Sequence, residues 1–429
     1  MRATLPPSLY RTTHFIIFLI IAFINAFVDL GHKIIIQNTV FKIYDDSQQV
    51  LLTALVNGLI LLPFILTFTA SGFLSDRFAK PRIMQWAAFM AIILTLLITF
   101  SYYQGWFIFA FCMTFLLALQ SAIYSPAKYG YIRELVGDQK IADANGLTQA
   151  TSIVAILSGI ILFSVGFEHY LAPHDFDSEQ QIVMLIAPLG WLLVLLSLIE
   201  FLLALSLPDL RKQRRARTFN WQQYRQGQLF KNNLTLLRQS PVIWLAILAL
   251  SLFWGISQTV LATFPAFAKL VLDESNTVVI QGLLACAGIG IIIGSITAGK
   301  LTNHFSRYLI TIGALGQLIV LSILPQLADT LLFASAIVCF GLFGGLFIVP
   351  LNTLIQHHAP LSHLGTILAG NNWLQNMVML TFLVLTMLAA LFNLSSWLIL
   401  ISLPVILFLC FLLLSLKISN ITVKVDVLD

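Results

Sequence analysis

Charged residues are scarce in this sequence. Asp, Glu, Lys and Arg together make up 10% of the 429 residues, whereas hydrophobic residues make up 59%. The mean hydropathy is correspondingly high, at +0.93. A chain with so little charge cannot cover a water-soluble globule with polar surface. The composition therefore excludes a soluble fold and predicts a helical protein that crosses a membrane many times.

Cysteine is scarce as well. All four cysteines stand inside apolar runs without metal-like spacing: Cys112, Cys286, Cys339 and Cys410. Such residues are typical of small buried hydrophobic side chains rather than of disulfides or metal ligands. The sequence thus predicts no metal site and no cofactor.

Signatures of catalysis and of ATP use are missing. No H-x-x-x-x-D acyltransferase motif begins at any of the eight histidines. The nearest approach to a P-loop runs from Gly294 to Lys300, but it continues into Leu301 instead of Ser or Thr and stands within an apolar run. We therefore expect neither an enzyme nor an ATP-driven pump.

Apolar runs of membrane-spanning length are abundant, at about 20 residues or more each. There are twelve, near 13–36, 48–74, 82–102, 105–124, 141–167, 181–207, 240–270, 277–302, 307–327, 330–356, 364–392 and 394–416. A long polar stretch that contains RKQRRAR divides them into two groups of six. The sequence predicts an all-α integral membrane protein with an N-terminal six-helix bundle at 1–207, a linker at 208–240, and a C-terminal six-helix bundle with a short tail at 241–429.

Positive charge predicts the orientation, because short loops rich in Lys and Arg stay in the cytoplasm. If both termini are cytoplasmic, 20 of the 23 Lys and Arg residues fall on that side. The opposite loops keep only Lys42 and Lys269 and are rich in Asp and Glu. The formal charge of +5 is thus a topology signal and an attraction for anionic lipid headgroups rather than a nucleic-acid signature.

Ionisable residues interrupt the first apolar run. Asp29, His32 and Lys33 stand near its middle, where an ionised side chain costs several kcal/mol unless it faces a cavity or a partner. Asp29 and Lys33 are four residues apart and share one helix face. They form either a solute-binding group in the membrane or a structural ion pair that locks this helix to a neighbour.

A loop motif occurs twice at equivalent places. GFLSDRFAKPR begins at Gly72, between the second and third runs, and GKLTNHFSR begins at Gly299, between the eighth and ninth. The pattern resembles the loop signature of the major facilitator superfamily, whose fold consists of two six-helix bundles. Asp76 is suited to accept hydrogen bonds from a helix N-terminus and so to close the cytoplasmic face. We assign a gating role to Gly72, Asp76, Arg77, Lys80, Arg82, Gly299, Asn303 and Arg307, with a loop that only sets topology as the alternative.

Further segments narrow the resemblance. AFVD at 26–29, YSPAKYG at 124–130, GGLFIVPLN at 344–352 and LAGNN at 368–372 are similar to segments of the bacterial lysophospholipid transporters and of the transporter domains fused to acyltransferase and acyl-ligase modules. The resemblance covers nearly all twelve runs. It departs at Leu30, where the family usually has Asn, and at Leu261, where the standalone transporters carry Arg, so Lys33 is a candidate for the missing positive charge.

The resemblance implies that the protein moves lysophospholipids, chiefly lysophosphatidylethanolamine, from the outer to the inner leaflet of a bacterial inner membrane. A cytoplasmic acyltransferase or acyl-ligase is the implied partner. Besides Asp29, His32 and Lys33, the candidate substrate-binding residues are Lys128, Asn145, Gln149, Gln258, Asn371, Asn372, Gln375 and Asn376. For most of the amides, hydrogen bonding between helices is the competing interpretation.

Two other functions stay open at this point. One is export of a hydrophobic drug or siderophore, and the other is a scaffold for an acyltransferase that does not itself transport. Glu200, in the sixth run, is a candidate proton relay or a residue that only reaches toward the membrane surface. The acyl tail is expected to stay in lipid, through a lateral gap beside the fifth and eighth or the second and eleventh runs.

Overall fold

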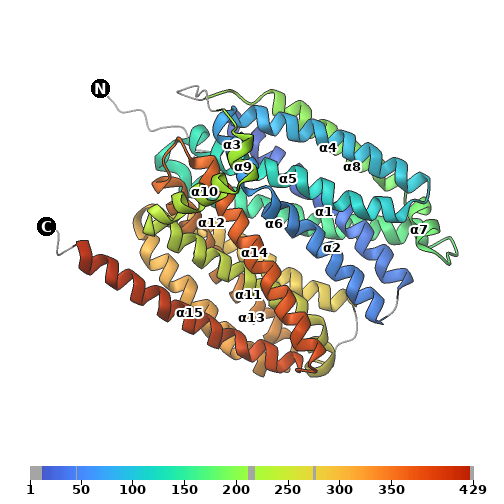
Figure 1. Cartoon of the computed structure of the whole chain (residues 1–429). Coiled ribbons are helices and arrows are strands. Elements are labelled where there is room, and N and C mark those ends of the chain that lie inside the picture. The colour runs from blue at the N-terminus through green and yellow to red at the C-terminus, as the bar shows by residue number, and fades with distance from the viewer. Residues whose placement is uncertain (1–11, 45, 211–217, 274–276, 426–429) are drawn as a thin grey trace.

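The computed structural model describes residues 12–44, 46–210, 218–273 and 277–425. Every regular element in these ranges is helical (Figure 1). The first group comprises α1 (Thr13–Ile43), α2 (Asp46–Leu66), α3 (Phe68–Arg77), α4 (Lys80–Tyr103), α5 (Phe107–Val136), η2 (Asp138–Lys140), α6 (Ile141–Leu171), α7 (Glu179–Leu185) and α8 (Pro188–Leu205). The second comprises α9 (Trp221–Arg225), α10 (Gln228–Gln239), α11 (Pro241–Val271), α12 (Thr277–Ile323), η3 (Leu324–Gln326), α13 (Thr330–His358), α14 (Leu364–Leu391) and α15 (Ser396–Val425).

These helices account for the twelve predicted runs. Ten helical segments in the described ranges are long and apolar enough to cross a membrane, and the bent pair α2 and α3 forms another. α15 contributes a further apolar helix, with Ser396–Leu412 as its shorter apolar part. α12 contains two of the ten, Val279–Asn303 and Phe305–Gln326, which meet at the non-helical backbone of Phe305. The all-α multi-pass fold class is as predicted.

Two local features differ from the runs read off the sequence. The second run is broken by a bend of 56° between α2 and α3. Pro63 lies one turn before the break, where it lacks the N–H of a continuous helix and crowds the preceding turn. The helix of the fourth run, α5, extends to Val136 rather than ending near 124. YSPAKYG therefore lies inside α5 despite Pro126.

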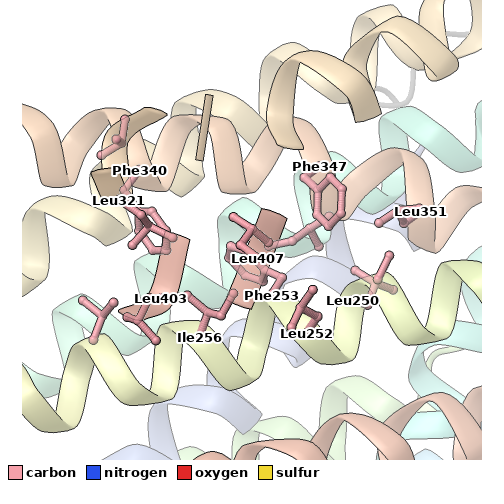
Figure 2. Packing of buried hydrophobic residues seen from close by; sticks show 14 of the residues in the cluster. Leu250, Leu252, Phe253, Ile256, Leu321, Phe340, Phe347, Leu351, Leu403 and Leu407 are labelled. Atoms are coloured by element: carbon pink, nitrogen blue, oxygen red, sulfur yellow. The ribbon is translucent and has the colours of Figure 1, made fainter. Parts of the chain in front are cut away.

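Each group of helices surrounds apolar cores of its own. In the first group, Phe163, Phe167 and Tyr102 are among the fully buried side chains. In the second, Phe253 of α11 packs among residues of α13 and α15 such as Phe340 and Leu407 (Figure 2). Most of each core thus lies within one group, although Phe68 of α3 joins the core of the second group. We call the two groups the N-terminal and C-terminal bundles.

The bundles meet along two seams. α6 packs against α12 and α13 on one seam, and α3, α2 and α5 pack against α14 on the other. Glycine permits the close approach: a Cβ on Gly146 of α6 would lie 2.4 Å from the carbonyl oxygen of Ser295, and a Cβ on Gly72 of α3 would lie 2.8 Å from Cα of Thr366. α3, which carries Gly72, lies with α9 and α10 at one end of the molecule (Figure 1). We call this end the linker end.

Candidate functional site

Asp29 stands near the middle of α1 and is half-buried. Its Oδ2 accepts a hydrogen bond from the hydroxyl of Ser121 on α5. The ammonium of Lys128, two turns further along α5, also acts on this carboxylate. The acid therefore faces α5, within the N-terminal bundle, rather than a purely apolar surface.

Lys128 is the buried cation of this region. Its side chain is 9% exposed, and Nζ lies 5.6 Å from the ring centroid of Tyr124 and 5.1 Å from that of Tyr129. Aromatic faces at such distances stabilise an ammonium by cation–π attraction. The helical continuation of α5 through YSPAKYG explains the arrangement, because Tyr124 and Lys128 are four residues apart and share a face.

The polar contacts continue from α5 into the C-terminal bundle. Ser125, one turn after Ser121, accepts a hydrogen bond of 2.9 Å from Nδ2 of Asn372 on α14. Asn376 Nδ2 in turn donates to the carbonyl of Asn372 at 2.7 Å. We call Asp29, Ser121, Ser125 and Asn372 the central polar seam, since their hydrogen bonds connect α1 with α5 and α5 with α14.

The other two ionisable residues of α1 are placed differently. His32 is fully buried inside the N-terminal bundle, with Nδ1 2.7 Å from the Tyr102 hydroxyl and Nε2 3.1 Å from the carbonyl of Ala110. Its ring therefore does not join the central polar seam. Lys33 is half-buried, and the described residues contain no ion pair between it and Asp29. The structure does not show the internal Asp29–Lys33 pair that was one of the two interpretations.

The remaining amide side chains do not gather at one site. Asn371 Oδ1 accepts from Gln375 Nε2 at 2.8 Å along α14. Asn145 of α6 belongs instead to the other seam, where it donates to Thr353 at 3.2 Å and accepts from Gln356 at 2.9 Å. Gln149 of α6 is buried and Gln258 of α11 half-buried. The contacts described for these last two do not connect them to the central polar seam.

Asp76 connects the bundles at the linker end. Its Oδ1 accepts from the backbone N–H of Gly365 at 2.7 Å, and its Oδ2 accepts from the N–H and the hydroxyl of Thr366 at 3.2 and 2.6 Å. Gly365 and Thr366 begin α14, so the carboxylate meets the orphan N–H groups and the positive dipole end of that helix.

The other seam is closed at the same end by Arg133, at the end of α5. Its Nη1 donates to the carbonyls of Gln356 and Ala359 at 2.7 and 2.8 Å, where α13 ends. Asn303 of α12 donates to the carbonyl of Gln139 at 3.0 Å. Arg133 and Asn303 therefore connect the two bundles across this seam, as Asp76 does across the other.

The other residues of the repeated loop take local positions. Lys80 forms a buried ion pair with Glu134 of α5, within one bundle. The Arg77 guanidinium stands over the rings of Phe73 and Phe78. Arg82 and Arg307 are exposed, whereas Gly299 lies buried against α6, close to Asp143.

Sequence reasoning did not single out Ser121, Ser125, Gln356 or Thr366, and it treated Arg133 only as a topology signal. Serine and threonine hydroxyls occur throughout membrane helices, so no pattern marks those that bridge neighbouring helices. Arg133 directly precedes Glu134, and both lie in the last turns of α5.

Comparison with known families and proteins agrees with this geometry. The model of the Major Facilitator Superfamily matches residues 14–382. Two bacterial proteins, both named lysophospholipid transporter LplT, align over most of the chain. The one from Escherichia fergusonii is 30% identical over 80% of both chains, and the one from Photorhabdus laumondii is 28% identical over 85% of both. The chain belongs to the lysophospholipid transporter family of the major facilitator superfamily.

Solved structures of other major facilitators share the fold of this family member. The transporter FucP in an outward conformation superposes with a TM-score of 0.70 at 12% identity, covering 92% of this chain and 97% of that one. The human organic anion transporter MFSD10 superposes with a TM-score of 0.68 at 13% identity, covering 96% and 100%. These likenesses support the predicted twelve-helix major facilitator fold.

Proposed function

We propose that this protein moves lysophospholipids, and lysophosphatidylethanolamine in particular, from the outer to the inner leaflet of a bacterial inner membrane. It acts by alternating access, as a transporter and not as an enzyme. The observation that carries the proposal is the central polar seam with Lys128 beside it, in a chain that aligns with lysophospholipid transporters over four fifths of its length.

The chemistry of the site suits this headgroup. A lysophosphatidylethanolamine headgroup carries a phosphodiester anion and an ammonium. Lys128, with Lys33 as a second candidate, supplies positive charge for the phosphate, while Asp29 supplies negative charge for the ammonium. Charge-assisted hydrogen bonds are the strong ones at low local dielectric. Asn372 and Asn376 add uncharged hydrogen-bonding groups from the opposite bundle.

The closed linker end indicates to which side of the membrane the site is open in this conformation. Its loops carry the basic residues, so the orientation rule places it in the cytoplasm, together with both termini. The contacts of Asp76 and Arg133 then seal the cytoplasmic side, and the site is expected to communicate with the outer side. Delivery to the inner leaflet requires these contacts to break, which is the gating role proposed for the repeated loop. The expected consumer of the delivered lipid is a cytoplasmic acyltransferase or acyl-ligase.

The acyl tail is expected to remain in the bilayer while the headgroup crosses. A single chain gains about 0.8 kcal/mol for each CH2 kept out of water, so enclosing the tail in an aqueous cavity would forfeit that gain. Both seams are tightly packed near Gly72 and Gly146. We therefore expect the tail to enter along a seam in the half of the molecule away from the linker end.

A flipping assay with the purified full-length protein tests the proposal. Proteoliposomes receive labelled lysophosphatidylethanolamine, with diacyl phosphatidylethanolamine as the lipid control. We expect flipping of the lysolipid only, a large loss in Asp29→Asn and in Lys128→Gln, and no loss in Lys42→Gln. Lys42 is a suitable control because it lies at the end of α1 and pairs with Glu168 at the surface.

The same assay separates the rival functions. A scaffold would give no flipping above protein-free vesicles. A drug or siderophore exporter would be inhibited by organic cations or hydroxamates and would not distinguish lysolipid from a competitor that lacks the glycerophosphate group. Mass analysis of the vesicle lipids would expose any change in acyl chains and hence any catalytic activity.

A further inference from the structure

We propose that the linker end carries a second binding site, for a small phosphate ester such as a glycerophosphate group, in a cavity that the two bundles share. A ligand bound in this cavity holds the linker end closed. Binding at this site does not depend on the transport function proposed above, and only its effect on lipid delivery rests on that function.

The cavity lies where η2 of the N-terminal bundle faces α12 and the end of α13. Its volume is about 530 Å³, within the range of roughly 300–1,000 Å³ that is usual for small-molecule sites. Its polar lining includes Asp138 and Gln139 of η2, Asn303 and Ser306 of α12, and His357 and His358 of α13. Because both bundles supply its walls, the cavity has this shape only while the linker end is closed.

Several hydrogen-bonding groups of the cavity are available to a ligand. The Ser306 hydroxyl and the ring nitrogens of His357 bond to no other described residue. His358 keeps its Nδ1 3.0 Å from the carbonyl of Leu354, so its Nε2 is left to the cavity and becomes a donor when the ring is protonated. Hydroxyl, amide and imidazolium groups are donors that phosphate oxygens accept. The described residues include no group of three or more His, Cys, Asp or Glu suited to a metal ion.

The charges around the cavity favour an anion. Asp138 is the carboxylate of the lining, and Arg133 balances its charge, because Nε of Arg133 donates to Oδ1 of Asp138 at 2.6 Å. Within 139–145 and 298–308, the other residues charged at neutral pH are Lys140, Asp143, Lys300 and Arg307. Three of these four are cations, so the positive field at this end attracts a phosphate group.

A ligand in the cavity shifts the equilibrium between the conformations. It contacts both bundles when the linker end is closed and loses one wall of its site when that end opens. A ligand that binds only the closed form lowers the open-to-closed ratio about elevenfold at ten times its Kd. With the linker end in the cytoplasm, as proposed above, a phosphate ester there slows the release of lipid into the inner leaflet.

Calorimetry on the purified full-length protein tests the site. We expect sn-glycerol 3-phosphate to bind and glycerol, which lacks the phosphate, not to bind. The double variant His357→Gln/His358→Gln should lose at least tenfold in affinity. His174→Gln changes an exposed histidine in the loop before α7 and should keep the wild-type affinity.

A lipid arm distinguishes the source of the phosphate group. Lysophosphatidate in nanodiscs presents the same glycerophosphate on an acyl chain. If it binds, the double variant loses that binding, and the soluble ester does not bind, the ligand of the site is a lipid headgroup. Binding of the soluble ester identifies a soluble ligand. Binding of neither compound, equal binding of glycerol, or wild-type affinity in the double variant overturns the site.

Cysteine labelling tests the effect on closure. In protein with cysteines introduced near the linker ends of α6 and α12, saturating sn-glycerol 3-phosphate, or lysophosphatidate if only the lipid binds, should lower labelling several-fold. Gly146→Leu pushes α6 away from α12 and should weaken ligand binding, whereas Gly58→Leu, in open space, should not. Unchanged labelling at saturation, or wild-type affinity in Gly146→Leu, overturns the coupling between ligand and closure. Neither measurement uses lipid flipping, so a failure here leaves the transport proposal standing, and a protein that flips no lipid can still bind the ester.

Discussion

The carboxylate of Asp76, from the N-terminal bundle, accepts a 2.7 Å hydrogen bond from the backbone N–H of Gly365, at the start of α14 in the C-terminal bundle. A negative charge at a helix N-terminus contributes about 0.3–1 kcal/mol at an exposed site and up to about 2 kcal/mol when partly buried. Because the two groups belong to different bundles, that energy favours one conformation of the transporter over the other rather than the fold itself.

Asp76→Asn should therefore weaken closure of the linker end. The amide keeps one acceptor oxygen but loses the charge, so we expect the open-to-closed ratio at this end to rise about threefold to tenfold, as a loss of about 0.7–1.4 kcal/mol implies. Labelling of cysteines introduced near the linker ends of α6 and α12 measures the ratio. Lys42→Gln, which changes a surface ion pair outside the repeated loop, is the control. Equal labelling in both variants would reduce Asp76 to a topology signal.

Arg133→Gln should act on the other seam in the same direction. The guanidinium satisfies two carbonyls where α13 ends, at Gln356 and Ala359, and each such charged hydrogen bond is worth about 1.5–3 kcal/mol. The effect should add to that of Asp76→Asn, because the two contacts share no partner. Labelling of the double variant no greater than that of either single variant would show that one contact already controls closure.

Gly146→Leu should prevent closure by bulk alone. A Cβ at this position would lie 2.4 Å from the Ser295 carbonyl oxygen, so α6 and α12 could not keep their present distance. We expect normal expression, strong labelling at the linker end and little flipping. Gly58→Leu is the matched control, since a Cβ there meets nothing within 4 Å. A Gly146→Leu protein that still flips lipid would show that this close approach is dispensable.

His32→Asn should reduce folded protein more than it alters transport. The ring bonds to Tyr102 and Ala110 inside one bundle, and buried groups left without partners cost about 1–3 kcal/mol each. We expect a lower melting temperature, with an unchanged lipid affinity in the protein that does fold. Asp29→Asn should instead lower the lipid affinity and leave the melting temperature nearly unchanged. A loss of affinity with unchanged stability in His32→Asn would instead make the histidine a substrate contact.

The order of helices and the Asp76 contact could both be anticipated from the sequence. Run length identifies membrane helices, and an acid in a repeated loop suggests a helix N-terminus as its partner. The sequence could not predict that His32 and Asp29 would face different neighbours. The two residues are three apart, so the turn of the helix puts them only about 60° from each other. Which neighbour lies on each side depends on packing between distant segments.

The same limit applies to α5. YSPAKYG contains a proline and stands where an apolar run becomes polar, so the helix was expected to end there. It continues because the neighbouring helices bury Tyr124, Pro126 and Ala127, and tertiary packing outweighs the local penalty of proline. This continuation aligns Ser121, Ser125 and Lys128 on successive turns, which is why the central polar seam was only partly visible in the sequence.

The linker helix α10 touches both bundles. Leu237 is fully buried beside Gly370 of α14, while Phe230 packs edge-on against Phe68 of α3, 5.8 Å between ring centroids, and against Trp373, at 5.4 Å. When α3 and α14 part, α10 must release at least one of them and uncover aromatic surface. Separation of the bundles would thereby change the surface of the protein at the linker end, outside the bilayer. The rings of Phe68, Phe230 and Trp373 would then be accessible at the linker end in the open conformation and covered in the closed one.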